Sequence, residues 1–259
     1  MAEQLLQSIG NTPLVKLSKL VSPEDADVYI KLESFNPTGS YKDRMAAAII
    51  KAAENRGDLR KGMTVIECTA GGTGTSLAFV CALNGYPLKI ITSAAFAPEK
   101  LRAMKVFGAM LDIVSAPGGK ITPDLIPQMM AKVKDLSLSG EYYWTRQFEN
   151  MDALSGYEAM GTEIVNQLPG NVDAFCVSVG TAGMYVGVTK MLREANEHIE
   201  TIIVEPSSSP LIAKGIKGTH SIDGISVGFV PPLLKNTTYD DVLLIEESEA
   251  RLIAKRLAK

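Results

Sequence analysis

Residues 36–44 read Asn36-Pro37-Thr38-Gly39-Ser40-Tyr41-Lys42-Asp43-Arg44, a turn that leads into a helix. Ser40 is a good helix N-cap, and Asp43 three residues later completes a capping-box pattern. An Ala- and Ile-rich run follows, and Gly57 is suited to end it. The pattern therefore predicts a helix over residues 41–56, with Lys42 in its first turn.

The predicted position of Lys42 favours a reactive amine. Unpaired N–H groups at the start of a helix disfavour a cation, and burial against Met45 and Ile49 would disfavour it further. A neutral lysine is a nucleophile that can form a Schiff base with a carbonyl compound. The residues alone leave open an ordinary lysine whose stem is buried and whose ammonium reaches solvent.

Composition limits the class of protein. With 259 residues, 46% hydrophobic and 21% charged, the chain can form two sub-domains or one large α/β domain. A net charge of -3 gives no basic field for a phosphate backbone, so we expect no nucleic-acid partner. No apolar stretch has the length of a membrane helix, and the N-terminus lacks a signal pattern, so the sequence predicts a cytoplasmic protein without a membrane partner.

The three cysteines, Cys68, Cys81 and Cys176, are far apart and lie in apolar runs. This spacing is typical of reduced structural thiols, and the sequence predicts neither a disulfide framework nor a metal site.

Strands and helices are predicted to alternate along most of the chain. A short helix (2–7) and two strands (13–17 and 27–33) precede the Lys42 helix. The later strands are predicted at 64–68, 88–92, 111–114, 142–145, 174–179, 201–205 and 241–245. The later helices are predicted at 75–84, 98–107, 123–136, 152–168, 184–196 and 247–259, with a Gly118-Gly119 loop before the third of these. This order predicts an α/β fold with mostly parallel sheets.

Two glycine-rich loops follow apolar strands and open helices. They read Thr69-Ala70-Gly71-Gly72-Thr73-Gly74 and Gly180-Thr181-Ala182-Gly183. Several backbone N–H groups converge at such a position, which makes it an anion site. A tight turn that uses glycine for its dihedral angles is the alternative for either loop alone. Two such loops beside an activated lysine favour an amino acid whose carboxylate binds one loop and a cofactor whose phosphate binds the other.

Other nucleotide and hydrolase motifs fail. Leu77 stands where the dinucleotide fingerprint needs its third glycine, and no Gly-Lys-Ser/Thr ends a P-loop. Residues 224–228 match Gly-x-Ser-x-Gly, but Pro231 and Pro232 follow where a helix is needed, and both histidines precede the motif. These residues therefore argue against a serine hydrolase.

Six segments together resemble one family. They are residues 36–44, the loop 69–73, Gln147-Phe148-Glu149-Asn150, the loop 180–183, Glu205-Pro206, and residues 224–231. Their order and spacing are similar to those of the cysteine synthase (O-acetylserine sulfhydrylase) family of fold type II pyridoxal-phosphate enzymes, whose fold is tryptophan synthase beta-like. The likeness covers essentially the whole chain. The motif at 36–44 is also similar to that of threonine synthases.

The resemblance implies a fold of two three-layer αβα sub-domains. Residues 36–146 would form a small substrate-side domain, and residues 1–35 plus 147–259 a large cofactor-side domain. The cofactor implied is pyridoxal 5'-phosphate. The partners implied are an amino-acid substrate, sulfide or another thiol, and a second copy of the chain in a homodimer.

The resemblance also assigns roles to residues. Lys42 would form the Schiff base with the cofactor and act as the general base. Gly180, Thr181, Ala182, Gly183 and Met184 would hold the cofactor phosphate, and Gly72 would lie at the cofactor ring. The substrate carboxylate would bind Thr69, Gly71, Thr73 and Gln147. The implied reaction is loss of the β-substituent of O-acetylserine to give an aminoacrylate, followed by addition of sulfide to give L-cysteine.

Three departures separate this chain from the family pattern. Gly72 replaces an asparagine whose amide meets the ring oxygen of the cofactor in cysteine synthases, and Ala182 and Met184 replace a glycine and a threonine of the phosphate loop. Relatives continue beyond the position of Lys259, which predicts a C-terminally shortened form, natural or made. The alternatives are a serine/threonine dehydratase- or threonine synthase-like lyase, and a truncated non-catalytic homologue that keeps the fold.

Overall fold

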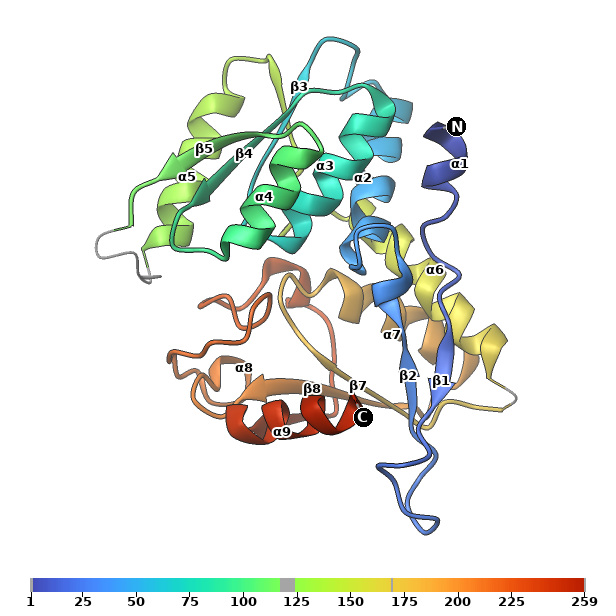
Figure 1. Ribbon diagram of the computed structural model, residues 1–259. Coiled ribbons are helices and arrows are strands. Elements are labelled where there is room, and N and C mark those ends of the chain that lie inside the picture. Colours follow the sequence, from blue (N-terminus) through green and yellow to red (C-terminus); the bar gives the residue numbers. More distant parts are fainter. Residues whose placement is uncertain (1, 117–123, 169, 259) are drawn as a thin grey trace. The chain divides into compact units, whose positions relative to one another are not determined.

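The structure is a computed structural model that describes residues 2–116, 124–168 and 170–258. Its helices and strands alternate in the predicted order (Figure 1). The helices are α1 (Ala2–Leu6), α2 (Lys42–Arg56), α3 (Gly72–Asn84), α4 (Pro98–Val106), α5 (Leu125–Ser137), α6 (Asp152–Gln167), α7 (Gly183–Ala195), α8 (Leu211–Lys214) and α9 (Glu247–Leu257). Short 3-10 helices are η1 (Glu33–Phe35) and η3 (Pro232–Leu234). The predicted loop at 118–119, the predicted helix start at 123 and residue 259 lie outside the described residues.

The strands form three sheets. A two-stranded antiparallel sheet pairs β1 (Leu14–Lys16) with β2 (Tyr29–Lys31). A four-stranded parallel sheet has the order β5-β4-β3-β6, and a three-stranded parallel sheet has the order β7-β8-β9. The bounds in these two sheets are β3 (Thr64–Cys68), β4 (Leu88–Ser93), β5 (Met110–Val114), β6 (Tyr142–Trp144), β7 (Ala174–Ser178), β8 (Glu200–Pro206) and β9 (Asp241–Ile245). The prediction of an α/β fold with mostly parallel sheets is confirmed.

Contacts divide the chain into two units. The first comprises residues 1–10 and 36–156, and the second residues 11–35 and 157–259. These units differ from the predicted domains in where residues 1–10 and 147–156 belong. The substrate-side and cofactor-side roles given to the domains stay predictions.

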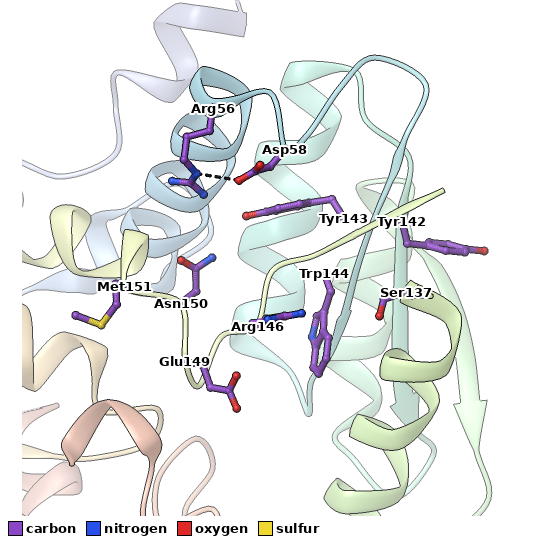
Figure 2. A pocket seen from close by; sticks show the side chains of 10 residues that line it. All are labelled: Arg56, Asp58, Ser137, Tyr142, Tyr143, Trp144, Arg146, Glu149, Asn150 and Met151. Atoms are coloured by element: carbon purple, nitrogen blue, oxygen red, sulfur yellow. Dashed lines mark hydrogen bonds and ion pairs between the residues drawn. The ribbon is translucent and has the colours of Figure 1, made fainter. Parts of the chain in front are cut away.

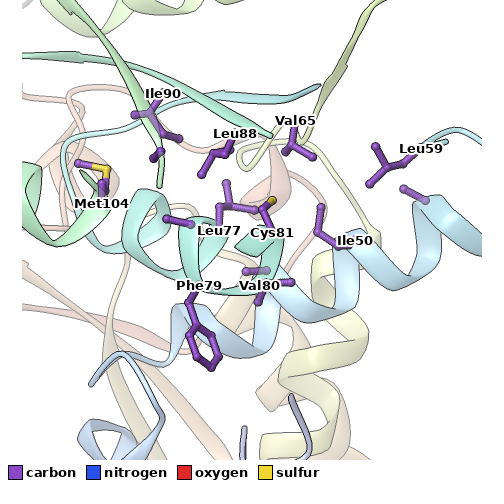
Figure 3. Packing of buried hydrophobic residues seen from close by; sticks show 14 residues of the cluster. Ile50, Leu59, Val65, Leu77, Phe79, Val80, Cys81, Leu88, Ile90 and Met104 are labelled. Carbon is purple, nitrogen blue, oxygen red and sulfur yellow. The ribbon is translucent and has the colours of Figure 1, made fainter. Parts of the chain in front are cut away.

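Helices cover both faces of the four-stranded sheet in the first unit. Side chains of α2, α3 and α4 fill one face with a core that includes Ile50, Leu77, Val80, Ile90 and Met104 (Figure 3). Helix α5 covers the other face, where its Met129 and Val133 pack with Ile66 and Ile91. Val65 and Ile66 are neighbours on β3 and belong to opposite cores, because successive side chains of a strand point to opposite faces. The first unit is thus a three-layer αβα structure.

In the second unit the parallel sheet packs against α7. Its core contains Val179, Tyr185, Ile203 and Leu234. On α9 the apolar side chains Leu252, Ile253 and Leu257 are exposed, at 57%, 41% and 45%. Across the described ranges, none of the helices is both long and apolar enough to cross a membrane.

Candidate active site

The turn before α2 presents Lys42 at the start of a helix, as predicted. The helix begins at Lys42 itself, with Tyr41 as its flanking residue, and the hydroxyl of Ser40 accepts a 3.1 Å hydrogen bond from the Lys42 N–H. The capping-box prediction is wrong, because the N-cap residue is Tyr41 instead of Ser40 and its side chain makes no cap hydrogen bond. The carboxylate of Asp43 accepts hydrogen bonds from the N–H and the hydroxyl of Thr38 instead of turning back to Ser40, because the turn places Thr38 over it.

Lys42 is buried, with 8% of its surface exposed, and so are Met45 and Ile49 of the same helix. Its Nζ lies 4.8 Å from the centroid of the Tyr41 ring. A lysine amine held against an aromatic ring in a buried position has little freedom to move into water. This environment suits a lysine that binds a ligand better than one that only covers surface.

The first glycine-rich loop lies beside Lys42. Helix α3 begins at Gly72, three residues before the predicted start at 75. A Cβ atom added to Gly72 would lie 3.7 Å from the Ser40 Oγ and 3.8 Å from the Lys42 Cγ. The first turn of α3, with its unpaired N–H groups, and the Lys42 side chain therefore border the same space.

The predicted substrate residues lie together at the carboxyl ends of β3 and β6. Thr69 and Thr73 are buried, and the Thr69 hydroxyl accepts a 3.1 Å hydrogen bond from the Gly71 N–H. The Thr73 hydroxyl donates to Oε1 of Gln147 at 2.7 Å. This edge of a parallel sheet is where α/β proteins usually bind their ligands.

The amide of Gln147 is held at both of its polar atoms. Besides the bond from Thr73 to Oε1, its Nε2 donates to the Cys68 carbonyl oxygen at 2.7 Å. A primary amide carries two hydrogens on nitrogen, and the bond to Cys68 uses one of them. The second can be offered to an acceptor such as a carboxylate.

Glu67 is part of this arrangement, although the sequence did not predict it. It lies at the end of β3 with 1% of its surface exposed, and its carboxylate accepts hydrogen bonds from Thr145 Oγ1 at 2.6 Å and from the Gln147 N–H at 2.9 Å. Burial raises the pKa of the Glu67 carboxyl, while these hydrogen bonds act in the opposite direction. A carboxylate at the end of an otherwise apolar buried strand is the signal that could have identified it.

The second glycine-rich loop belongs to the second unit. Gly180, Thr181, Ala182 and Gly183 are all buried, and Met184 is half-buried at the start of α7. Ala182 has a φ of 68°, which turns successive N–H groups toward a common centre. A Cβ atom on Gly180 would come within 2.2 Å of the Gly224 carbonyl oxygen, so only glycine fits there. The role of this loop as an anion site stays a prediction.

A separate pocket of about 560 Å³ lies in the first unit (Figure 2). Its walls include Trp144, Arg146 and Glu149, and the Arg146 guanidinium lies 5.2 Å from the Trp144 ring centroid. Lys42, Thr73 and Gln147 are not among the described residues that line it. The pocket therefore lies next to the turn that carries Gln147 and is distinct from the predicted site.

Comparison with known proteins agrees with this geometry. A family model described as "Pyridoxal-phosphate dependent enzyme" matches residues 5–259. A cysteine synthase of Staphylococcus aureus (strain Mu50 / ATCC 700699) is 37% identical over 259 residues, which cover 99% of this chain and 82% of the relative.

Solved structures of related enzymes share the fold. The structure of a cysteine synthase from Entamoeba histolytica superimposes with a TM-score of 0.90 at 33% identity, covering 98% of this chain and 75% of that one. A hydrogen sulfide-producing enzyme from Fusobacterium nucleatum gives a TM-score of 0.90 at 33% identity, covering 100% of this chain and 85% of that one. The chain therefore belongs to the family of pyridoxal-phosphate dependent enzymes and is a homologue of cysteine synthases.

Proposed function

We propose that the protein catalyses β-replacement on an O-activated L-serine, O-acetylserine, with sulfide as the nucleophile and L-cysteine as the product. The observation that carries the proposal is the hydrogen bond between Thr73 and Gln147 beside the buried Lys42 turn. This bond orients the Gln147 amide, whose second hydrogen remains to be donated, at the carboxyl end of a parallel sheet. The relatives of the chain include cysteine synthases.

The residues fit the cofactor of the family. The loop 180–184 offers the backbone N–H groups of a buried turn at the start of a 13-residue helix, and the glycine at 180 has no room for a side chain. The cofactor phosphate would bind these N–H groups together with the Thr181 hydroxyl, and Ala182 and Met184 would contribute backbone only. Lys42 would hold the aldehyde carbon, and Gly72 would leave space for the ring.

When bound, pyridoxal phosphate supplies an electron sink that stabilises negative charge at the substrate α-carbon. Lys42 Nζ would take the proton from that carbon, since a buried amine is a suitable base for it. Thr69, Gly71, Thr73 and Gln147 would bind the substrate carboxylate and so fix which bond of the α-carbon faces the lysine.

The test has two stages. Protein incubated with pyridoxal phosphate should gain a visible absorbance band that is absent from Lys42→Ala. O-acetylserine plus sulfide should then yield cysteine. If the protein gains no absorbance band, the cofactor role is refuted. If it gains the band but forms no cysteine, the proposed reaction is refuted and the cofactor role stands.

A lyase is the second candidate. It is favoured by the likeness to the hydrogen sulfide-producing enzyme of Fusobacterium nucleatum and by Gly72, which replaces an asparagine of the cysteine synthase pattern. The same base and carboxylate site would then serve elimination. Release of a keto acid from O-acetylserine without sulfide, or of sulfide from L-cysteine, would identify this activity.

A further inference from the structure

The carboxylate of Glu67 is surrounded by hydrogen-bond donors. Its Oε1 accepts from the Cys68 N–H at 2.8 Å and from the Trp144 Nε1–H at 3.2 Å. Its Oε2 accepts from Thr145 Oγ1 at 2.6 Å and from the Gln147 N–H at 2.9 Å. Two donors on each oxygen fill the acceptor capacity of an ionised carboxylate.

Burying the Glu67 carboxylate costs free energy of folding. A buried charge is costly unless it is fully hydrogen-bonded, and an apolar residue at the end of β3 would avoid the cost. The four donors belong to residue 68, which precedes the predicted carboxylate residue Thr69, and to residues 144–147, of which only Gln147 is a predicted carboxylate residue. Glu67 thus joins the ends of β3 and β6.

The partners of Glu67 control the position of Gln147 from two sides. Glu67 accepts from the Gln147 N–H and so fixes its backbone. It also accepts from the N–H of Cys68, the residue whose carbonyl oxygen holds the Gln147 side-chain amide. With Thr73 donating to the amide oxygen, Gln147 has one orientation available.

We propose that Glu67 is a positioning residue for the amino-acid substrate. It holds Gln147 so that the second amide hydrogen is directed to the substrate carboxylate, and it does so without touching the substrate. This inference rests on the proposed function, because it assigns the carboxylate subsite of the same site.

The substitution Glu67→Gln is expected to remove the hydrogen bond from the Gln147 N–H selectively. An amide replaces one acceptor oxygen with an NH2 group, which cannot accept. Facing Cys68 and Trp144, the NH2 group would meet two fixed N–H donors. Facing Thr145 and Gln147, it would meet a hydroxyl that can rotate to accept and only one fixed N–H donor. The second orientation is favoured, and it leaves the Gln147 N–H without its acceptor.

The experiment compares two ligands that differ at the carboxylate. Wild-type and Glu67→Gln holoprotein are titrated with L-serine and with L-serinamide, following the change in the visible absorbance of the cofactor. Affinity for L-serine should fall about tenfold or more in Glu67→Gln, whereas affinity for L-serinamide should stay within about twofold. A loss confined to the carboxylate ligand is a readout that general destabilisation would not produce.

Thr145→Val is the matched control. It removes a hydrogen bond to the same oxygen of Glu67 from a residue that is also fully buried, and it keeps the bond to the Gln147 N–H. The control should keep the wild-type ratio of the two affinities. If Glu67→Gln yields no folded holoprotein, Glu67→Asp takes its place, since it keeps two acceptor oxygens but is one methylene too short to reach all four donors.

A second measurement needs no substrate. Trp144 is the sole tryptophan of the chain, so its indole N–H gives a single resonance that reports directly on the bond to Glu67. That resonance should change little in Glu67→Gln, because the favoured amide orientation keeps the oxygen on the Trp144 side. A large shift would contradict the expected orientation.

The outcomes separate this inference from the proposed function. Wild-type holoprotein that prefers L-serine, together with Glu67→Gln that keeps the preference or loses both affinities equally, would overturn the positioning role alone. Wild-type holoprotein that binds neither ligand would overturn the proposed function, and the positioning role with it.

Discussion

The hydroxyl of Thr73 donates a 2.7 Å hydrogen bond to Oε1 of Gln147, a residue 74 positions further along the chain. Thr73 lies in the first turn of α3, and Gln147 follows β6. The parallel pairing of β3 with β6 brings these two segments to the same edge of the sheet. A long-range contact between two polar side chains, both buried, is costly to maintain unless a ligand or the fold uses it.

Thr73→Val should weaken binding of the amino acid while leaving the fold intact. Valine has nearly the same shape but cannot hold the Gln147 amide, so the KM for O-acetylserine is expected to rise about tenfold, with a smaller fall in kcat. Steady-state kinetics at saturating sulfide measure both values. Thr75→Val is the control, since the Thr75 hydroxyl makes only a 3.5 Å contact with the Gly71 carbonyl oxygen. Equal effects of the two changes would contradict a role for the Thr73–Gln147 pair.

Gly72 and Gly74 are expected to respond differently to the same substitution. A Cβ atom at Gly74 would lie 2.3 Å from the Met104 Sδ and 2.7 Å from the Thr69 Cγ2, whereas one at Gly72 makes ordinary contacts of 3.7 Å and 3.8 Å. Gly74→Ala should therefore lower the free energy of unfolding by about 1–3 kcal/mol. Gly72→Ala should change it by less than about 0.5 kcal/mol. Urea denaturation measures both, and a larger loss for Gly72→Ala would refute the packing argument.

Much of the secondary structure follows from sequence pattern. Strands 64–68 and 241–245 were predicted with the bounds that the structure has, because each is an apolar run between turn signals. Helix α3 begins three residues earlier than predicted, at Gly72. Glycine is a poor helix former, and two of the three residues before the predicted start are Gly72 and Gly74, so the sequence pattern there indicates a loop.

Helix α8 was not predicted, and it is stabilised by a carboxylate that lies outside the helix. The carboxylate of Glu205 accepts hydrogen bonds from the N–H groups of Ile212 and Ala213, at distances of 2.9 to 3.0 Å. A four-residue helix has little stability of its own, so this cap at the end of β8 determines it. Because Glu205 lies seven residues before Ile212, in a turn-rich passage, the sequence around α8 shows no pattern that predicts a helix.

The candidate site was predicted unevenly. Lys42 and the two glycine-rich loops could be selected from helix starts and turns, which are local features. Gln147 was selected through the family resemblance, and Glu67 was not selected at all. The pairing of β3 with β6 brings Glu67 and Gln147 together. The register between two strands so far apart in the sequence cannot be predicted from the residues near either one.

The three cysteines should differ sharply in reactivity. Cys176 is exposed, whereas Cys68 and Cys81 are buried. Burial raises the pKa of all three thiols, that of Cys81 to about 12 and that of Cys68 also through the neighbouring Glu67, so exposure is what sets Cys176 apart. Because the thiolate is the reactive form, Ellman's reagent at about pH 8 should label one thiol quickly in native protein and all three in denaturant. Cys176→Ser should remove the fast phase. A fast phase that survives this substitution would show that a buried cysteine is accessible.

Asp240 should contribute stability that is lost in acid. Its Oδ2 accepts from the Thr201 N–H at 2.7 Å and from the Thr201 hydroxyl at 2.8 Å. These bonds lower the pKa of Asp240 below the unfolded value of about 3.9. The ionised form is therefore favoured by folding, and the contribution is present above the unfolded pKa and disappears as the pH falls through the folded pKa.

Urea midpoints of wild type and Asp240→Asn measure this contribution. The two proteins should differ at about pH 6 and converge toward about pH 3. Glu197→Gln is the control, because the Glu197 side chain is 86% exposed, and it should match the wild type at both pH values. A difference between wild type and Asp240→Asn that grows as the pH falls would contradict the sign of the pKa shift.

Gly180 should be required for cofactor binding through the shape of its loop. A Cβ atom there would come 2.2 Å from the Gly224 carbonyl oxygen, and the backbone at 226 is tied to this turn by a 3.0 Å hydrogen bond from the Ser226 N–H to the Val179 carbonyl oxygen. Gly180→Ala must therefore displace one of the two loops, which turns the N–H groups at 180–183 away from their common centre. Affinity for pyridoxal phosphate should fall at least about tenfold, because several charge-assisted hydrogen bonds weaken together.

Titration with pyridoxal phosphate, followed by visible absorbance and by the rise in Tm, measures that loss. Gly170→Ala is the matched control in the same unit, since nothing lies within 4 Å of a Cβ atom at that position. The control should bind pyridoxal phosphate as the wild type does. If Gly180→Ala keeps wild-type affinity, the phosphate is held elsewhere and the loop is only a structural turn. If both substitutions reduce affinity equally, the effect comes from the stability of the unit rather than from the shape of the loop.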